Sequence, residues 1–113
     1  MSSRPTSRVL QIALLLLPSL LWPLQAGAAC KAGFVPRLAA DADDVCVLPL
    51  TRVRTAGENA RAPLLWNSGP FGPKTCAIGF VWREAFVGDF SCVLPAVRSQ
   101  TVQDNANAAS RRE

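Results

Sequence analysis

The chain contains the same cysteine-bearing segment twice. Residues 30–62 and 76–108 align at a shift of 46 without a gap, and 16 of the 33 aligned positions are identical. Self-similarity at a fixed spacing is typical of a duplicated structural unit. The sequence therefore predicts two tandem repeats, unit 1 (residues 29–62) and unit 2 (residues 76–108).

Each unit holds two cysteines with 15 intervening residues. Pairing within each unit, Cys30 with Cys46 and Cys76 with Cys92, is the one that a single ancestral unit could have made alone, and pairing between intertwined units stays open. Closing a loop of this size contributes about 3 kcal/mol in the chain-entropy model, a large share for so short a chain. The competing use, a zinc site, is disfavoured because the sequence has no His and no C-x2-C pair, so no metal or cofactor is expected.

Each unit is expected to be a β-hairpin followed by a short helix. In unit 2, residues 79–85 alternate in polarity, residues 91–94 are β-prone, and Gly88 with Asp89 supplies the turn. In unit 1, Pro36 cannot donate a ladder hydrogen bond, which favours an edge strand. The expected fold class is a small, disulfide-stabilised α+β protein with two tandem repeats.

A proline follows each hairpin at a position suited to the first turn of a helix. We expect helices over residues 97–106 and 50–62. Gly57 lowers the helix propensity of the second segment. Residues 63–75 are expected to form a Gly/Pro-rich linker, because their glycines and prolines exclude a continuous helix or a central strand. The apolar side chains of this linker are expected to pack across both units. Residues 109–113, with the Arg111-Arg112 doublet, are expected to be a flexible, solvated tail.

Residues 1–28 have the order of a secretory signal peptide. Arg4 and Arg8 precede an apolar run, and Ala26 and Ala28 are the small residues of a cleavage site. We expect cleavage after Ala28, with cleavage one residue later as the nearest alternative, no stable membrane span after cleavage, and a secreted or periplasmic protein.

The leader has two alternative fates. A retained anchor is disfavoured because the apolar run is shorter than the ~20 residues that span a bilayer and is broken by Pro18 and Pro23. Lipidation of Cys30 would make the protein an anchored lipoprotein. Gly27 disfavours this, because it stands where such signals carry an aliphatic residue.

The formal net charge of +4 includes the two arginines of the leader. From Cys30 onward, the chain has 10 basic and 8 acidic residues, which gives a net charge of +2. This charge is too small and too dispersed for a nucleic-acid-binding surface. No nucleic-acid partner is expected.

The second copy reads C-x2-G-F-V-W-R-E-A-F-x-G-D-x2-C-V-x-P-x2-R, preceded by G-P-F-G-P-x-T and followed by D-N-x2-A-x-S-R-R. This pattern resembles a cysteine-containing repeat of secreted bacterial proteins for which no activity is assigned. The resemblance implies an exported bacterial module and transfers no catalytic or ligand residue. The first copy departs from the pattern at Pro36, Leu38 and Ala40.

Enzymatic activity is not expected. The absence of His removes imidazole bases, and Ser91 and Ser99 lack a neighbouring base. Asp43 and Asp89 recur in both units together with Arg37 and Arg83, which indicates a surface salt bridge or turn hydrogen bond inside each hairpin. No catalytic residue is therefore assigned.

The expected function is a non-enzymatic binding or structural module of the cell envelope or extracellular space, with any binding surface in unit 2. Trp82, Glu84, Phe86 and Phe90 lie on one hairpin and are not repeated in unit 1. Aromatic side chains beside charged ones suit a cell-envelope glycan or a segment of another secreted protein. The alternatives are that a minimal domain buries these aromatics in its core, or that the turn at 41–44 or 86–90 acts as the rigid loop of an inhibitor of a secreted enzyme.

Two further repeated pairs are expected to be structural. Arg52 with Arg98, and Asn59 with Asn105, recur on the two expected helices. We expect them to dock each helix on a hairpin and not to bind a ligand.

Overall fold

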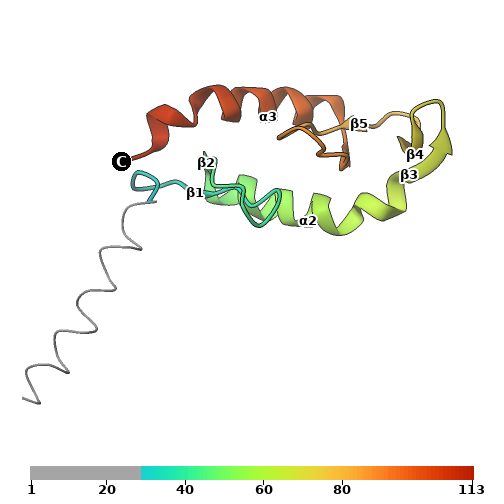
Figure 1. Cartoon of the computed structure of the whole chain (residues 1–113). Helices are drawn as coiled ribbons and strands as arrows, with labels where there is room; N and C mark the ends of the chain where they lie inside the picture. Colours follow the sequence, from blue (N-terminus) through green and yellow to red (C-terminus); the bar gives the residue numbers. More distant parts are fainter. Residues whose placement is uncertain (1–28) are drawn as a thin grey trace, which may run out of the picture.

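A computed structural model of the chain describes residues 29–113, so the predicted signal peptide lies outside the described part (Figure 1). Three two-stranded antiparallel sheets and two main helices make up the fold. The elements in chain order are β1 (Val35–Pro36), β2 (Cys46–Val47), α2 (Pro49–Leu65), β3 (Trp66–Gly69), β4 (Gly72–Cys76), β5 (Val81–Trp82), β6 (Cys92–Val93), α3 (Pro95–Asn107) and the 3₁₀ helix η1 (Ala109–Arg111).

The expected class is confirmed at this level: a small α+β protein with two helices, short hairpins and two disulfide bridges. In Figure 1, α2 and α3 run along the molecule with opposite chain directions, and α2 contacts β1 and β6 whereas α3 contacts β5. The β3–β4 hairpin lies at one end of the pair, where the chain passes from α2 towards α3. We call residues 29–65 the first half and residues 76–113 the second half.

The hairpins β1–β2 and β5–β6 have the same register 46 residues apart. Val35 pairs with Val47 as Val81 pairs with Val93. Each hairpin turns through a non-glycine residue in the left-handed region, Leu38 at φ 58° and Glu84 at φ 56°. The strained residue is held by the aspartate of the same turn, whose Oδ2 accepts a hydrogen bond from the next backbone N–H.

The disulfide bridges join Cys30 to Cys46 and Cys76 to Cys92, as expected from pairing within a unit. Each bridge ties the segment before a hairpin to the second strand of that hairpin. Because Cys46 and Cys92 are buried, the bridges also form part of the small core.

Helix α2 is longer than expected. It begins at Pro49, passes Gly57 and continues through Pro63 to Leu65. Pro63 lies in the last turn, where its missing N–H costs the helix one hydrogen bond to the carbonyl of the preceding turn. Helix α3 begins at Pro95 and ends at Asn107, close to the expected bounds.

The segment expected as a linker is ordered secondary structure. Residues 63–65 complete α2, and the following residues form β3–β4, with Trp66 opposite Cys76 and Asn67 opposite Thr75. Gly72 supplies the positive φ of the turn at 94°. The Thr75 hydroxyl closes this turn, because it accepts from the Phe71 N–H and donates to the Gly72 carbonyl.

The expectation of a flexible, solvated tail is wrong. Residues 109–111 form η1, and Arg112 pairs with Cys30 in an antiparallel bridge. The Arg111 guanidinium donates to Asp104 and to the Cys46 carbonyl and lies 5.1 Å from the Phe34 ring centroid. The doublet is therefore anchored by charge and by cation–π contact.

The interior of the described part is unusually polar. Val47, Val93 and a few small residues form the apolar core, whereas Arg37 and Arg83 are 2% and 1% exposed. Buried charges are tolerated only when paired and hydrogen-bonded. The arrangement of these pairs is therefore central to stability. Within residues 29–113, no helix combines the length and the apolar character needed to cross a membrane.

Candidate functional site

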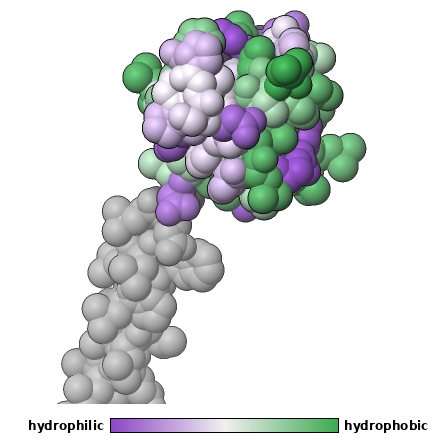
Figure 2. Space-filling model, turned by 90° about the vertical axis from the view of Figure 1, so that its right-hand side faces the viewer, coloured by the Kyte–Doolittle hydropathy of each residue, from purple (hydrophilic) through white to green (hydrophobic). Residues whose placement is uncertain are grey.

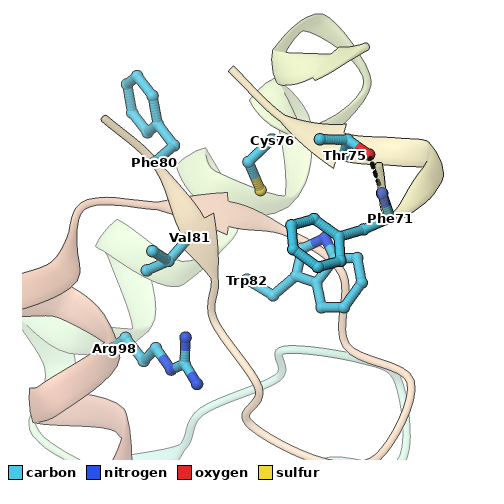
Figure 3. A pocket seen from close by; sticks show the side chains of 7 residues that line it. All are labelled: Phe71, Thr75, Cys76, Phe80, Val81, Trp82 and Arg98. Carbon is cyan, nitrogen blue, oxygen red and sulfur yellow. Dashed lines mark hydrogen bonds between the residues drawn. The ribbon is translucent and has the colours of Figure 1, made fainter. Parts of the chain in front are cut away.

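An open cleft of about 320 Å³ lies between the β3–β4 hairpin, strand β5 and the first turns of α3 (Figure 3). Its wall is mostly apolar. The lining residues are Phe71, Thr75, Cys76, Phe80, Val81, Trp82 and Arg98. A cleft of this size falls in the range of small-ligand sites. We call it the Trp82 cleft.

Strand β5 holds Trp82 at the centre of an aromatic cluster. Its ring centroid is 6.0 Å from that of Phe71, in an edge arrangement, and 4.7 Å from that of Phe90. The indole N–H donates a 2.8 Å hydrogen bond to the Lys74 carbonyl, which fixes the ring against the β3–β4 hairpin. Trp82 is half-buried, so it is neither a core residue nor a fully exposed one.

A second set of contacts joins the same hairpin to the turn of β5–β6. The Trp66 indole N–H donates to the Phe90 carbonyl at 2.7 Å. The Lys74 ammonium lies 4.7 Å from the Trp66 ring centroid and 5.5 Å from that of Phe90. The expected linker therefore contacts the second half through its aromatic residues and supplies one wall of the cleft.

Arg98 of α3 is the charged residue that lines the Trp82 cleft. Its Nη2 lies 2.8 Å from Oε1 of Glu84, and the two side chains are 43% and 50% exposed. Figure 3 shows the Arg98 side chain reaching from the helix towards the strand that carries Val81 and Trp82. An ion pair this exposed stabilises the fold little, so its guanidinium can change partner at low cost.

The four residues expected to form the binding surface are only partly brought together. Trp82 and Phe90 are in contact, and Glu84 reaches the cleft through its bond to Arg98. Phe86 lies elsewhere, in a second hollow of about 310 Å³ that is lined mostly by turn residues of the first half.

Sequence reasoning missed Phe71 and Phe80 and treated Arg98 as structural. The available signal was the apolar residues in a segment rich in Gly and Pro. Leu64, Phe71 and Ile78 all remain exposed in or near the β3–β4 hairpin. Figure 2 faces this end of the molecule and shows apolar residues on its surface among hydrophilic ones.

The repeated arginine and aspartate residues form buried structural pairs. Arg37 Nε lies 2.7 Å from Asp43 Oδ2, and Arg83 Nε lies 2.7 Å from Asp89 Oδ2. The expected pairing inside each hairpin is confirmed, but the expected surface location is wrong. Burial favours a higher pKa for Asp43, yet the Arg37 hydrogen bond, the Ala39 N–H and the Arg37 charge outweigh it and lower the pKa.

The repeated asparagines dock each helix on its own hairpin, as expected. Asn59 Nδ2 donates to the Leu38 carbonyl, and Asn105 Nδ2 donates to the Ala85 carbonyl. The repeated arginines of the helices differ from each other. Arg98 docks on Glu84, whereas its counterpart Arg52 is exposed on α2.

No group of three or more His, Cys, Asp or Glu side chains within residues 29–113 could hold a metal ion. The Trp82 cleft combines aromatic walls with one exchangeable cation, an arrangement suited to recognition. No protein-family model, curated protein or solved structure matches the chain.

Proposed function

We propose that the protein is an exported, non-enzymatic recognition module that binds its ligand in the Trp82 cleft. The observation that carries this proposal is the set of aromatic walls around an exposed arginine. In the β5–β6 hairpin, the other two charged residues, Arg83 and Asp89, are buried in a structural pair, which leaves Glu84, together with Arg98 of α3, to meet a ligand.

The features that recur between the two halves support a duplicated architecture. The hairpin register, the left-handed turn residue and the disulfide pairing recur 46 residues apart. The pairing of Arg112 with Cys30 has its counterpart in the pairing of Trp66 with Cys76. We infer a duplication in which each helix is followed by a strand that pairs with the start of the other unit.

The corresponding positions of the two units explain why the ligand site has no equivalent in unit 1. Pro36 stands where unit 2 has Trp82, so the first half lacks the central ring of the cleft. Arg52 occupies the position of Arg98 and serves as a matched control in every experiment on the site.

Export is supported by the two disulfide bridges, which are compatible with a periplasmic or extracellular protein. The predicted signal peptide would direct the chain there. A Cys30 sulfur bonded to Cys46 is not free to carry the thioether of a lipoprotein, so we do not propose the anchored form.

Of the two expected partners, the cleft favours a protein segment over a glycan. Sugar hydroxyls that enter an apolar cleft need hydrogen-bond partners, and losing water without them costs free energy. A peptide can fill the same space with one apolar side chain. We do not propose the inhibitor role for the turn at 41–44 or the turn at 86–90.

The test uses the mature, oxidised chain and a peptide library alongside cell-wall glycan fragments, with tryptophan fluorescence as the readout. We expect a peptide to bind, Trp82→Ala to abolish binding with the fold intact, and Phe86→Ala, which lies outside the cleft, to leave it unchanged. Binding that survives Trp82→Ala, or turnover of a substrate that is lost on Glu84→Gln, would contradict the proposal.

A further inference from the structure

The polar groups that face the Trp82 cleft are almost all occupied within the protein. The Trp82 indole N–H donates to the Lys74 carbonyl. The Thr75 hydroxyl both accepts from the Phe71 N–H and donates to the Gly72 carbonyl. The Cys76 sulfur is in a disulfide. Among the side chains that line the cleft, Arg98 is the one with donors to spare, because a guanidinium has five N–H groups and its ion pair joins one nitrogen to one oxygen.

The partner of Arg98 is suited to being replaced. Glu84 is half-exposed, and its own backbone is left-handed, with a φ of 56°. The hairpin fixes this backbone conformation, and the ion pair does not. The turn is held instead by the buried Asp89, whose Oδ2 accepts from the Ala85 N–H. Moving the Glu84 side chain therefore leaves the hairpin intact. Leu38, its counterpart, adopts the same backbone conformation without any carboxylate.

From this geometry we propose that the Trp82 cleft recognises a carboxylate attached to an apolar, ring-bearing group, with Arg98 exchanging Glu84 for the carboxylate of the ligand. This inference rests on the proposed function and specifies its ligand. The ring fills the space beside Phe71 and Trp82, and the carboxylate gives Arg98 the planar acceptor that a guanidinium binds best. A C-terminal aromatic residue of a peptide and a free aromatic acid share this chemistry.

The experiment measures affinities for two probes of equal size, N-acetyl-L-phenylalanine and N-acetyl-L-phenylalaninamide, by tryptophan fluorescence and calorimetry. We expect the acid to bind about three- to fivefold more tightly than the amide, the range of a partly exposed charge pair. Arg98→Ala should abolish this preference but retain amide binding. Arg52→Ala, the matched change in the first half, should leave the preference intact.

Glu84→Gln gives the opposite signature. It removes the competing carboxylate while keeping the size of the side chain, so acid affinity should rise by a few fold and amide affinity should not change. The acid preference should also weaken at high salt. Two further probes then distinguish the two sources: a peptide that ends in Phe, and 3-phenylpropanoate. Tighter binding of the peptide identifies a protein C-terminus as the ligand, and tighter binding of 3-phenylpropanoate identifies a free acid.

Failure of this inference is distinguishable from failure of the proposed function. Equal binding of acid and amide, or an acid preference that survives Arg98→Ala, would overturn the carboxylate assignment while leaving the cleft as a binding site. If binding of both probes were insensitive to Trp82→Ala, the cleft itself would be wrong. Circular dichroism of each variant excludes misfolding as the cause.

Discussion

Arg37 in the first half donates a 2.8 Å hydrogen bond from Nη1 to Oδ1 of Asn105, which lies 68 residues later in the second half. The counterpart bond runs the other way, from Arg83 Nη2 to Asn59 Oδ1, also at 2.8 Å. Each half thus supplies an arginine from its hairpin and an asparagine from its helix. The two halves are joined reciprocally, and neither arginine is fully partnered without the other half.

Removing one asparagine should weaken the fold. Asn105→Ala deprives a buried guanidinium of an acceptor, and hydrogen bonds to charged groups contribute about 1.5–3 kcal/mol. We expect a loss of that size in the free energy of unfolding by urea. As a control, Asn107→Ala at an exposed position of the same helix should change the free energy of unfolding by less than about 0.5 kcal/mol. Equal effects of the two changes would contradict the reciprocal joint.

The two halves differ at one buried carboxylate, and this predicts a stabilising change. Glu58 accepts from Arg83 and Arg54 through its two oxygens. Its counterpart Asp104 leaves Oδ2 buried without a partner in the described structure. Asp104→Glu should extend the carboxylate towards Arg37 and raise the free energy of unfolding by about 1 kcal/mol, measured as a higher denaturant midpoint at unchanged m-value. A lower midpoint would show that the site has no room for the added methylene.

The lowered pKa of Asp43 predicts an acid transition. Because Arg37 and two backbone N–H groups favour the carboxylate in the folded state, this residue stabilises the protein above the ordinary aspartate pKa of about 4. That contribution is lost as the pH falls through the lower folded pKa. In Asp43→Asn, the difference in stability from wild type should shrink as the pH falls from about 5 to 2. A constant difference would rule out titration of Asp43 as its source.

The hairpins, the helices that follow them and the disulfide pairing could be predicted because each has a local signal. Gly88 with Asp89 marks a turn, Pro95 marks a helix start, and equal cysteine spacing favours pairing within a unit. The ion pairs of Arg37 and Arg83 were also predictable from their repetition. Their burial was not, because a repeat indicates which residues recur and not which surface another element covers.

The Trp82 cleft could be predicted only in part for the same reason. Trp82 was identified because unit 1 lacks it, but the opposite wall comes from Phe71 in a segment whose composition resembles a linker. A Gly/Pro-rich stretch forms a hairpin here because Trp66 and Cys76 are held opposite each other, by the end of α2 and by a disulfide. The flexible-tail expectation failed because Arg111 meets Asp104 and Phe34, contacts that no local pattern indicates.

Each disulfide bridge should contribute separately to stability. Both bridges link residues 16 positions apart, so removing either pair, Cys30 with Cys46 or Cys76 with Cys92, should cost about 3 kcal/mol. Paired Cys→Ala variants under guanidinium unfolding check this value. Full reduction of the wild type should cost more than either variant. An unchanged midpoint in one variant would mean that its loop is already constrained by other contacts.

The central claim, that recognition belongs to the Trp82 cleft and has no equivalent in the first half, is tested most directly by nuclear magnetic resonance of the ¹⁵N-labelled mature protein during titration with N-acetyl-L-phenylalanine. The account predicts chemical-shift changes at the Phe71 amide, the Trp82 indole N–H and the Arg98 side chain, with the Arg52 side chain and the Val35 amide unmoved. Saturable changes centred on Arg52 and Val35, or no saturable change at Trp82, would contradict it.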